Sequence, residues 1–161
     1  MMEDKQYRIE KCDSKVQWDE FVLEHHGHPM QLWGWGDVRT GVGWQVDRLF
    51  VVEDDEPIAA VQLLTKRLPR PFTAVMYVPR GPVIVRSKTA VYEQFAAYVK
   101  HEYKGVALVV EPDDDGDVTG AGWRESDQHA QAGQSIVLDL SKAAGVLLAD
   151  MSATVREHIR T

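Results

Sequence analysis

A single cysteine, Cys12, is present among the 161 residues of the sequence. It excludes a disulfide framework and any zinc site built from four cysteines. Long apolar runs are also missing. The longest stretch without Asp, Glu, Lys or Arg runs from His25 to Gly36, which is far too short to span a bilayer. The N-terminal segment lacks the apolar core of a secretory signal. We therefore expect a cytoplasmic protein with no transmembrane segment.

Several motifs of nucleotide, acyl and metal chemistry are absent. The sequence has no P-loop, no Gly-x-Gly-x-x-Gly and no nucleophile elbow. The histidines of segment 25–28 invite a metal interpretation, but no further ligands follow at a matching spacing. The acidic segment 111–116 begins like a calcium loop, yet Gly122 stands where the calcium-loop rule requires Glu. We expect neither a metal nor a cofactor.

The formal charge of −7 conceals an asymmetry along the chain. Between Ala60 and Val110 there are eight basic residues and two acidic ones, a net charge of +6, and the rest of the chain carries −13. A basic middle in an acidic protein is compatible with a local site for phosphate or nucleic acid. The alternative, solvated faces whose charges cluster without a ligand, stays open.

Apolar periodicity predicts six strands, at residues 7–9, 45–53, 58–66, 74–78, 106–110 and 136–140. The turn 54–57 joins the second and third strands into a hairpin, and the proline-rich segment 68–71 interrupts the chain before the fourth. The fifth strand, Val106–Val110, is continuously apolar between Gly105 and Pro112. We expect it to be fully buried.

Helices are predicted over residues 14–26, 31–40, 87–103 and from 141 to the C-terminus. The first begins with the capping box Ser14-x-x-Gln17. We expect it to bury three apolar side chains: Val16, Phe21 and Leu23. The last helix carries an apolar stripe at positions 147, 151, 155 and 159 and reaches the end of the sequence without a stop signal. We interpret this as a chain cut inside an element.

The predicted order is β-α-α-β-β-β-α-β-β-α. Three antiparallel strands followed by a crossover helix and a buried strand indicate an α/β (α+β) fold, with a mixed, mostly antiparallel sheet flanked by helices. This order is that of the GNAT-like acyltransferase architecture, an analogy that does not determine the chemistry. We expect one GNAT-like domain over residues 1–161.

Four segments carry a more specific pattern. In sequence order they are Gln-Leu-Trp-Gly-Trp-Gly-Asp-Val-Arg at 31–39 with Gly43-Trp44 and Arg48, Tyr-Val-Pro-Arg-Gly-Pro-Val at 77–83, Gly122-Trp123 before 135–141, and Thr154-Val-Arg156-x-x-Ile159-Arg160. Together they resemble the FemABX family of non-ribosomal peptidyltransferases, from about Trp18 to Arg160. The family moves an amino acid from aminoacyl-tRNA to the peptide of a peptidoglycan precursor.

The resemblance implies a role in cell-wall synthesis and a set of site residues. Family members have two GNAT-like halves, and this chain resembles the first, precursor-binding half, with the second half absent. The substrate would be a UDP- or lipid-linked muramoyl pentapeptide, and aminoacyl-tRNA would be bound through the missing half. The positions that match substrate-contacting residues of the family are Arg39, Arg80, Thr154 and Arg156. No catalytic residue is assigned, because the lysine proposed to stabilise the oxyanion belongs to the second half.

We expect the three guanidinium groups of Arg39, Arg80 and Arg156 to converge on the diphosphate of the precursor. Two alternatives to this aminoacyltransferase interpretation stay open. The chain could be a non-catalytic half-domain that forms a homo-oligomer through the apolar stripe of its last helix. It could also be a single-domain acyl-CoA N-acyltransferase.

Overall fold

A computed structural model describes residues 6–113, 122–127, 130–132 and 138–160. The chain divides into two units, Met1–Gln131 and Ala132–Thr161, and each is described by itself. Among the described residues, no helix combines the length and the apolar character needed to cross a membrane.

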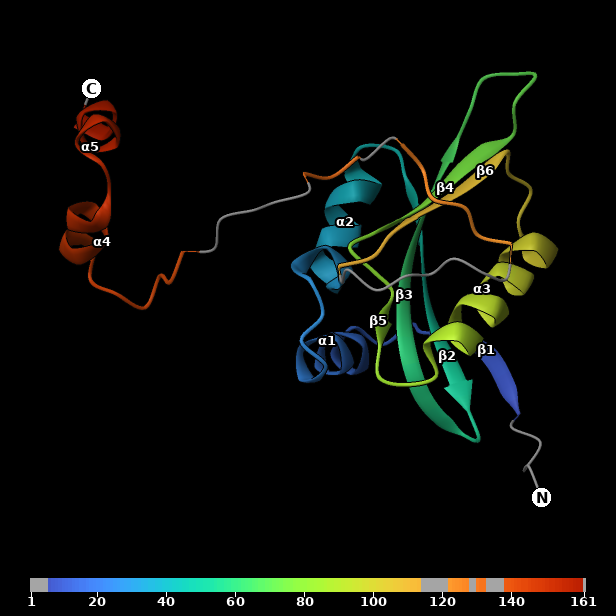
Figure 1. Ribbon diagram of the computed structural model, residues 1–161. Helices are drawn as coiled ribbons and strands as arrows, with labels where there is room; N and C mark the ends of the chain where they lie inside the picture. Colours follow the sequence, from blue (N-terminus) through green and yellow to red (C-terminus); the bar gives the residue numbers. More distant parts are fainter. Residues whose placement is uncertain (1–5, 114–121, 128–129, 133–137, 161) are drawn as a thin grey trace. The chain divides into compact units, whose positions relative to one another are not determined.

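The first unit is a mixed sheet with helices on both of its faces (Figure 1). Its elements are β1 (Tyr7–Lys11), α1 (Lys15–Glu24), the 3-10 turn η1 (Pro29–Gln31), α2 (Trp33–Gly41), β2 (Gln45–Glu53), β3 (Glu56–Arg67), β4 (Ala74–Pro79), β5 (Val83–Ile84), α3 (Lys88–Glu102) and β6 (Ala107–Glu111). The strand order is β1-β2-β3-β4-β6, with β5 also paired to β3. Only β4 and β6 run parallel among these pairs. The predicted mixed, mostly antiparallel sheet flanked by helices is confirmed.

Strand β3 organises the sheet because it pairs with three other strands. It pairs with β2 along most of its length. On its other side, β4 pairs with Leu64–Arg67 and β5 pairs with Ala59–Ala60. Residues 78–82 lie between these two pairings and are not paired with β3. The loop Arg80–Pro82 therefore lies where the sheet splits.

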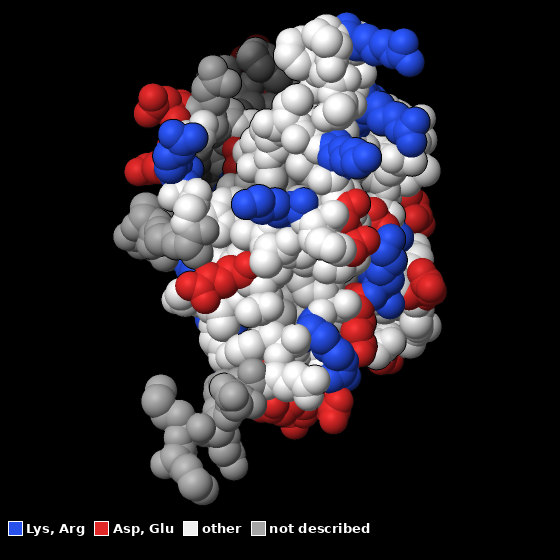
Figure 2. Space-filling view, turned by 90° about the vertical axis from the view of Figure 1, so that its right-hand side faces the viewer, with Lys and Arg blue, Asp and Glu red and all other residues white. Residues whose placement is uncertain are grey.

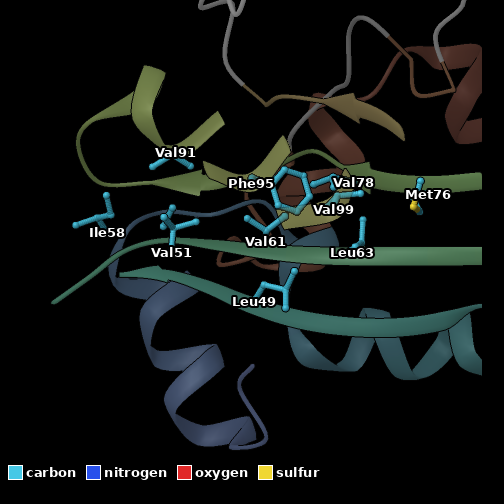
Figure 3. Close-up of a cluster of buried hydrophobic side chains, with 11 residues drawn as sticks. Leu49, Val51, Ile58, Val61, Leu63, Met76, Val78, Val91, Phe95 and Val99 are labelled. Atoms are coloured by element: carbon cyan, nitrogen blue, oxygen red, sulfur yellow. The ribbon is translucent and has the colours of Figure 1, made fainter. Parts of the chain in front are cut away.

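Two cores lie on opposite faces of the sheet. On one face, α3 packs Val91, Phe95 and Val99 against strand residues (Figure 3), which include Leu49, Val51, Ile58, Val61, Leu63, Met76 and Val78. On the other face, α1 packs Trp18 and Val22 against residues of β2, β3 and β5: Phe50, Val52, Ala60 and Val83. Apolar residues alternate between the two faces along β2, as the period of an extended strand requires.

The first predicted helix has the expected start but buries a different face. The Ser14 hydroxyl accepts a hydrogen bond from the Gln17 amide at 3.3 Å, which confirms the cap. The prediction that Val16 and Leu23 are buried was wrong, since their exposed fractions are 66% and 62%. The sheet instead receives the stripe of Trp18 and Val22, four residues apart on one helix face.

Strand β6 also differs from its prediction, because it is only partly buried. It pairs with β4 alone among the described strands. Of the predicted strand 136–140, residues 136 and 137 lie outside the described residues, and residues 138–140 are not in a strand.

The second unit contains two short helices, α4 (Ala144–Asp150) and α5 (Ala153–Arg160). A single helix from residue 141 was therefore the wrong prediction. Met151 has an extended conformation (φ −77°, ψ 153°) and ends α4. The Ser152 hydroxyl then accepts a hydrogen bond from the Val155 amide at 3.4 Å and begins α5.

Candidate functional site

Arg39 lies in the last turn of α2, beside the ring of Trp44. The chain reverses there because Gly43 has a positive φ of 83°, which glycine adopts without a steric penalty. The Trp44 amide donates to the Arg39 carbonyl at 3.1 Å. The Arg39 guanidinium carbon lies 5.3 Å from the centre of the indole ring, a cation–π distance.

Two further side chains approach Trp44 from neighbouring strands. Lys66, near the end of β3, has its ammonium group 5.7 Å from the ring centre and donates to the Val42 carbonyl at 2.9 Å. Tyr77, on β4, has its ring centre 6.5 Å from that of Trp44. The pairing of Leu64 with Tyr77 accounts for this approach, because it sets β4 beside the end of β3.

The phenol of Tyr77 is held between two polar partners. Its hydroxyl donates to the carboxylate of Glu111 on β6 and accepts from Gln131 Nε2 at 3.0 Å. Burial and the hydrogen bond to Glu111 together raise the pKa of Tyr77 to about 12. Tyr77 is therefore a neutral hydroxyl over the whole physiological pH range.

The raised pKa predicts a titration difference between the protein and its Tyr77→Phe variant. At about pH 11 the two folded proteins are expected to show equal tyrosinate absorbance, because Tyr77 is still neutral. Because the pKa is raised in the folded state, Tyr77 contributes its full stabilisation at every pH below its ordinary pKa of 10.0. This stabilisation is lost as the pH rises from there to about 12. In urea, where the pKa returns to its ordinary value, the parent protein should exceed the variant by one tyrosinate. An excess of one tyrosinate in the folded state would contradict the prediction.

Arg80 lies in the loop that follows β4, in the left-handed region with φ 48°. Its side chain is 20% exposed, and its guanidinium is 3.9 Å from the Asp113 carboxylate. Its positive charge acts on Tyr77, where it opposes the rise in the pKa of the phenol. Arg80 therefore lies in the electrostatic environment of the Tyr77 hydroxyl.

We call Arg39, Trp44, Lys66, Tyr77 and Arg80 the aromatic–cation cluster. Arg39 contacts Trp44, and Trp44 contacts Tyr77. Arg80 follows Tyr77 by three positions, and its charge acts on the phenol. Three cations around two rings suit an anion that also carries an aromatic or sugar group.

The other two predicted residues, Thr154 and Arg156, lie on α5 in the second unit. Thr154 is exposed. The Arg156 guanidinium donates to carbonyl oxygens at the end of α4, at 3.0 Å from Ala149 O and 2.5 Å from Met151 O. It thus satisfies terminal carbonyls of a helix. The convergence of Arg156 with Arg39 and Arg80 stays a prediction.

The loop that carries Arg80 is braced by a buried glutamine, Gln31. Gln31 Nε2 donates to the Pro79 carbonyl at 2.6 Å, and its Oε1 accepts from the Gln62 amide at 2.9 Å. A β-carbon on Gly81 would come within 2.5 Å of Gln31 Nε2. The side chain of Gln31 and the backbone of the loop therefore fit closely against each other.

Gln62 and Arg48 extend this brace towards α2. Gln62 Nε2 donates to Met30 O at 2.8 Å and to Leu32 O at 3.2 Å. Arg48 donates to Gln62 Oε1 at 3.2 Å and to Trp33 O at 2.7 Å, and its guanidinium stacks 3.5 Å from the centre of the Trp33 ring. Burial lowers the pKa of Arg48 from its ordinary value. These bonds join η1, α2, β2 and β3 to the Arg80 loop.

The expectation that acyl-chemistry motifs are absent was wrong in one respect, because Gln31, Gly34 and Gly36 have the Gln-x-x-Gly-x-Gly spacing of the pyrophosphate turn in acetyl-CoA enzymes. The spacing alone would favour a coenzyme A site. In the structure, the first amide of α2, that of Trp33, donates to the Asp19 carboxylate at 2.7 Å, so an anionic side chain already occupies this helix start. A β-carbon on Gly36 would meet Gln62 Oε1 at 2.5 Å. The segment is packed against the sheet and does not form a phosphate cradle.

The two segments considered for metals do not gather ligands in the described part of the chain. No group of three or more His, Cys, Asp or Glu side chains that could hold an ion occurs there. His28 Nδ1 accepts from the Met30 amide at 3.1 Å and begins η1. Glu111 accepts from Tyr77 and from the Gln131 amide.

Sequence reasoning alone did not assign Trp44, Lys66, Tyr77 or Gln31 to the site. Gln62 carried one signal, because it is a lone amide inside the apolar run of β3. Such a residue is expected to be buried with its hydrogen bonds satisfied. Gln31 carried no comparable signal, since its partners Gln62 and Pro79 are 31 and 48 positions away.

Residues 14–131 match the FemAB family. The chain belongs to the FemAB family. The matched region contains the whole aromatic–cation cluster and the Gln31 brace, so both are features of the FemAB part of this chain.

The curated relatives of this FemAB chain include lipid II:glycine glycyltransferases of staphylococci. The Staphylococcus saprophyticus protein is 36% identical over 100 residues, which are 59% of this chain and 24% of the relative. The Staphylococcus haemolyticus protein is 37% identical over 100 residues, with the same coverage. The chain thus matches about a quarter of the length of these relatives. A crystal structure of FemX is similar with a TM-score of 0.57 and 27% identity, over 65% of this chain and 27% of that chain.

Proposed function

We propose that this chain is the precursor-binding part of an aminoacyltransferase of peptidoglycan synthesis. The transfer would run from aminoacyl-tRNA to the peptide of a muramoyl precursor. The observation that carries the proposal is the aromatic–cation cluster, which lies inside the FemAB-matched region. The names of the staphylococcal relatives support a lipid-linked precursor as the acceptor.

The cluster offers groups that suit such a precursor. Its diphosphate is an anion, and guanidinium groups bind phosphate oxygens through paired, charge-assisted hydrogen bonds. Arg39 and Arg80 would supply these bonds, and Lys66 would add a third positive charge. The Trp44 ring would hold the Arg39 and Lys66 side chains in position for the diphosphate, since both cations lie against it.

The proposed reaction is aminolysis of an ester. The amine nitrogen of the precursor peptide bonds to the aminoacyl carbonyl carbon, the ester C–O bond breaks, and the tRNA hydroxyl leaves with a proton. In this proposal the chain binds and orients the acceptor, a contribution that converts an encounter between two substrates into a positioned attack. Because aminoacyl-tRNA is the donor, we place the protein in the cytoplasm.

Calorimetry with the UDP-linked muramoyl pentapeptide tests the proposal. We expect Arg39→Ala and Arg80→Ala each to weaken binding about 10- to 100-fold, the range for losing a charge-assisted hydrogen bond. Lys15→Ala is the matched control, because Lys15 is an exposed cation on α1 and does not belong to the cluster. Arg156→Ala should weaken binding to a similar degree if Thr154 and Arg156 belong to the same site.

Two results would contradict this proposal. The first is an absence of binding heat at millimolar precursor with a folded protein. The second is an equal loss of affinity in Lys15→Ala and Arg80→Ala. Stabilisation by acetyl-CoA instead of the precursor would favour the acyl-CoA alternative, and a dimer that light scattering detects and that fails to bind the precursor would favour the non-catalytic alternative.

A further inference from the structure

The connection between β3 and β4, residues 68–73, projects beyond the sheet (Figure 1). Its sequence is Leu-Pro-Arg-Pro-Phe-Thr. Phe72 is 59% exposed, and both prolines are exposed as well. The loop is closed by hydrogen bonds from the Leu68 amide to Thr73 O at 3.0 Å and from the Phe72 amide to Pro69 O at 3.1 Å. An apolar ring is therefore presented to solvent on a defined turn. We call residues 67–73 the hairpin tip.

Cations accompany this apolar turn. Arg67 and Arg70 are exposed, and neither has an ion pair with any residue that the structure describes. Lys104 lines a small hollow at the base of the hairpin together with Arg67 and Thr73. Glu102 also lines this hollow, and His101 Nδ1 lies 2.8 Å from its carboxylate.

The positive character of this end of the protein is local. No Asp or Glu occurs from Pro57 to Tyr92, a stretch with six Lys and Arg residues, although the whole chain carries −7. Figure 2 shows Lys and Arg at the upper right of the face over α3 and β6, Asp and Glu at its upper left, and charges of both signs over its lower half. A negatively charged partner would therefore be attracted to the hairpin end.

We propose that the hairpin tip docks this protein on an anionic phospholipid bilayer. An exposed aromatic ring flanked by arginines is the chemistry of the membrane interface, where the ring enters the headgroup boundary and the cations pair with lipid phosphates. A nucleic-acid strand is the less fitting partner. Strand-binding surfaces are grooves in which several aromatic rings alternate with cations, whereas this tip is a projecting turn with one ring.

Docking through the tip would also place the aromatic–cation cluster near the lipid surface. Tyr77, on β4, follows Phe72 by five positions. At about 3.3 Å per residue, the two lie at most about 17 Å apart. A diphosphate in the headgroup layer would thus be within reach of the cluster. Only this last step rests on the proposed function, because binding to lipid requires no precursor.

Sedimentation of the full chain with lipid vesicles tests the proposal. We expect binding to vesicles of phosphatidylcholine mixed with phosphatidylglycerol, no comparable binding to phosphatidylcholine alone, and loss of binding at high salt. Removing one cation near an anionic surface weakens binding about fivefold, so Arg67→Ala/Arg70→Ala should weaken it about 25-fold. Phe72→Ser should weaken it about tenfold through the loss of apolar burial.

Two matched controls use exposed residues on α1. Val16→Ser removes an apolar side chain that is 66% exposed, and Lys15→Ala removes a cation. Both variants should sediment with vesicles like the parent. Equal binding to neutral and anionic vesicles, or unchanged binding in the hairpin variants, would overturn the proposal. So would failure of the parent to bind vesicles together with RNA binding that the hairpin variants lose.

The outcome can be separated from that of the proposed function. The hairpin variants should bind the soluble UDP-linked precursor as the parent does, because they leave the aromatic–cation cluster intact. If the parent binds anionic vesicles but not the precursor, the docking proposal stands and the proposed function fails. The reverse result overturns the docking proposal alone.

Discussion

The Gln31→Ala variant is expected to lose about 3–5 kcal/mol of its free energy of unfolding. Gln31 is fully buried. Its Nε2 donates to the Pro79 carbonyl at 2.6 Å, and its Oε1 accepts from the backbone amide of Gln62 at 2.9 Å. Truncation leaves both backbone groups buried without a partner, at about 1–3 kcal/mol each, and a cavity adds to this cost. Urea unfolding followed by circular dichroism measures the loss.

The matched control for this variant is Gln17→Ala, which removes the same side chain at an exposed position of α1. It should change the free energy of unfolding by less than about 0.5 kcal/mol. A loss below about 1 kcal/mol in Gln31→Ala would mean that water replaces the amide. Where Gln31→Ala remains folded, it should also bind the precursor more weakly, because the loop that carries Arg80 has lost its brace.

The second large effect concerns Gly81, which follows Arg80. A β-carbon there would lie 2.5 Å from Gln31 Nε2 and 2.6 Å from Gln31 Cδ. The Gln31 side chain cannot retreat without breaking its bonds to Pro79 and Gln62. Gly81→Ala is therefore expected to cost about 1–3 kcal/mol, the usual range for overpacking. The midpoint of urea unfolding reports this cost.

A double-mutant cycle separates this clash from a general effect of losing glycine. In the Gln31→Ala background the obstructing atoms are gone, so Gly81→Ala should cost less than about 0.5 kcal/mol, a strong coupling between the two sites. Gly34→Ala is the control, because a β-carbon at Gly34 meets nothing within 4 Å. It should leave the protein as stable or slightly more stable. Additive costs in the cycle would rule out the proposed contact.

Local patterns predicted much of the fold. The strands 45–53 and 58–66 and their hairpin were predicted from alternation and turn residues, and the structure has β2 and β3 there. The Ser14 cap was equally local. The buried face of α1 was not predicted by such a local pattern. Several faces of this helix carry apolar residues, and only packing against the sheet selects Trp18 and Val22. Full burial of β6 failed for a similar reason, since the strand has one described neighbour.

The candidate site likewise combines residues that the sequence predicted with contacts that only the tertiary structure shows. Arg39 and Arg80 were assigned from a family resemblance. The structure shows Arg39 against Trp44 and Trp44 near Tyr77, whereas the membership of Arg80 in the site stays a prediction. The rings were visible in the sequence only as parts of motifs. Their approach depends on the pairing of β3 with β4, which sets Tyr77 beside Leu64. Thr154 and Arg156 stay predictions as members of this site.

The sequence by itself determined the order of the α-helices and longer strands in the FemAB part of the chain, though not η1 or β5, because turns, caps and alternation act between residues a few positions apart. Only the tertiary structure decided which polar side chains are partners. Gln31 and Pro79 are 48 positions apart, yet one hydrogen bond joins them. No local pattern encodes such a pair, since it forms only where η1 packs against the split between β4 and β5.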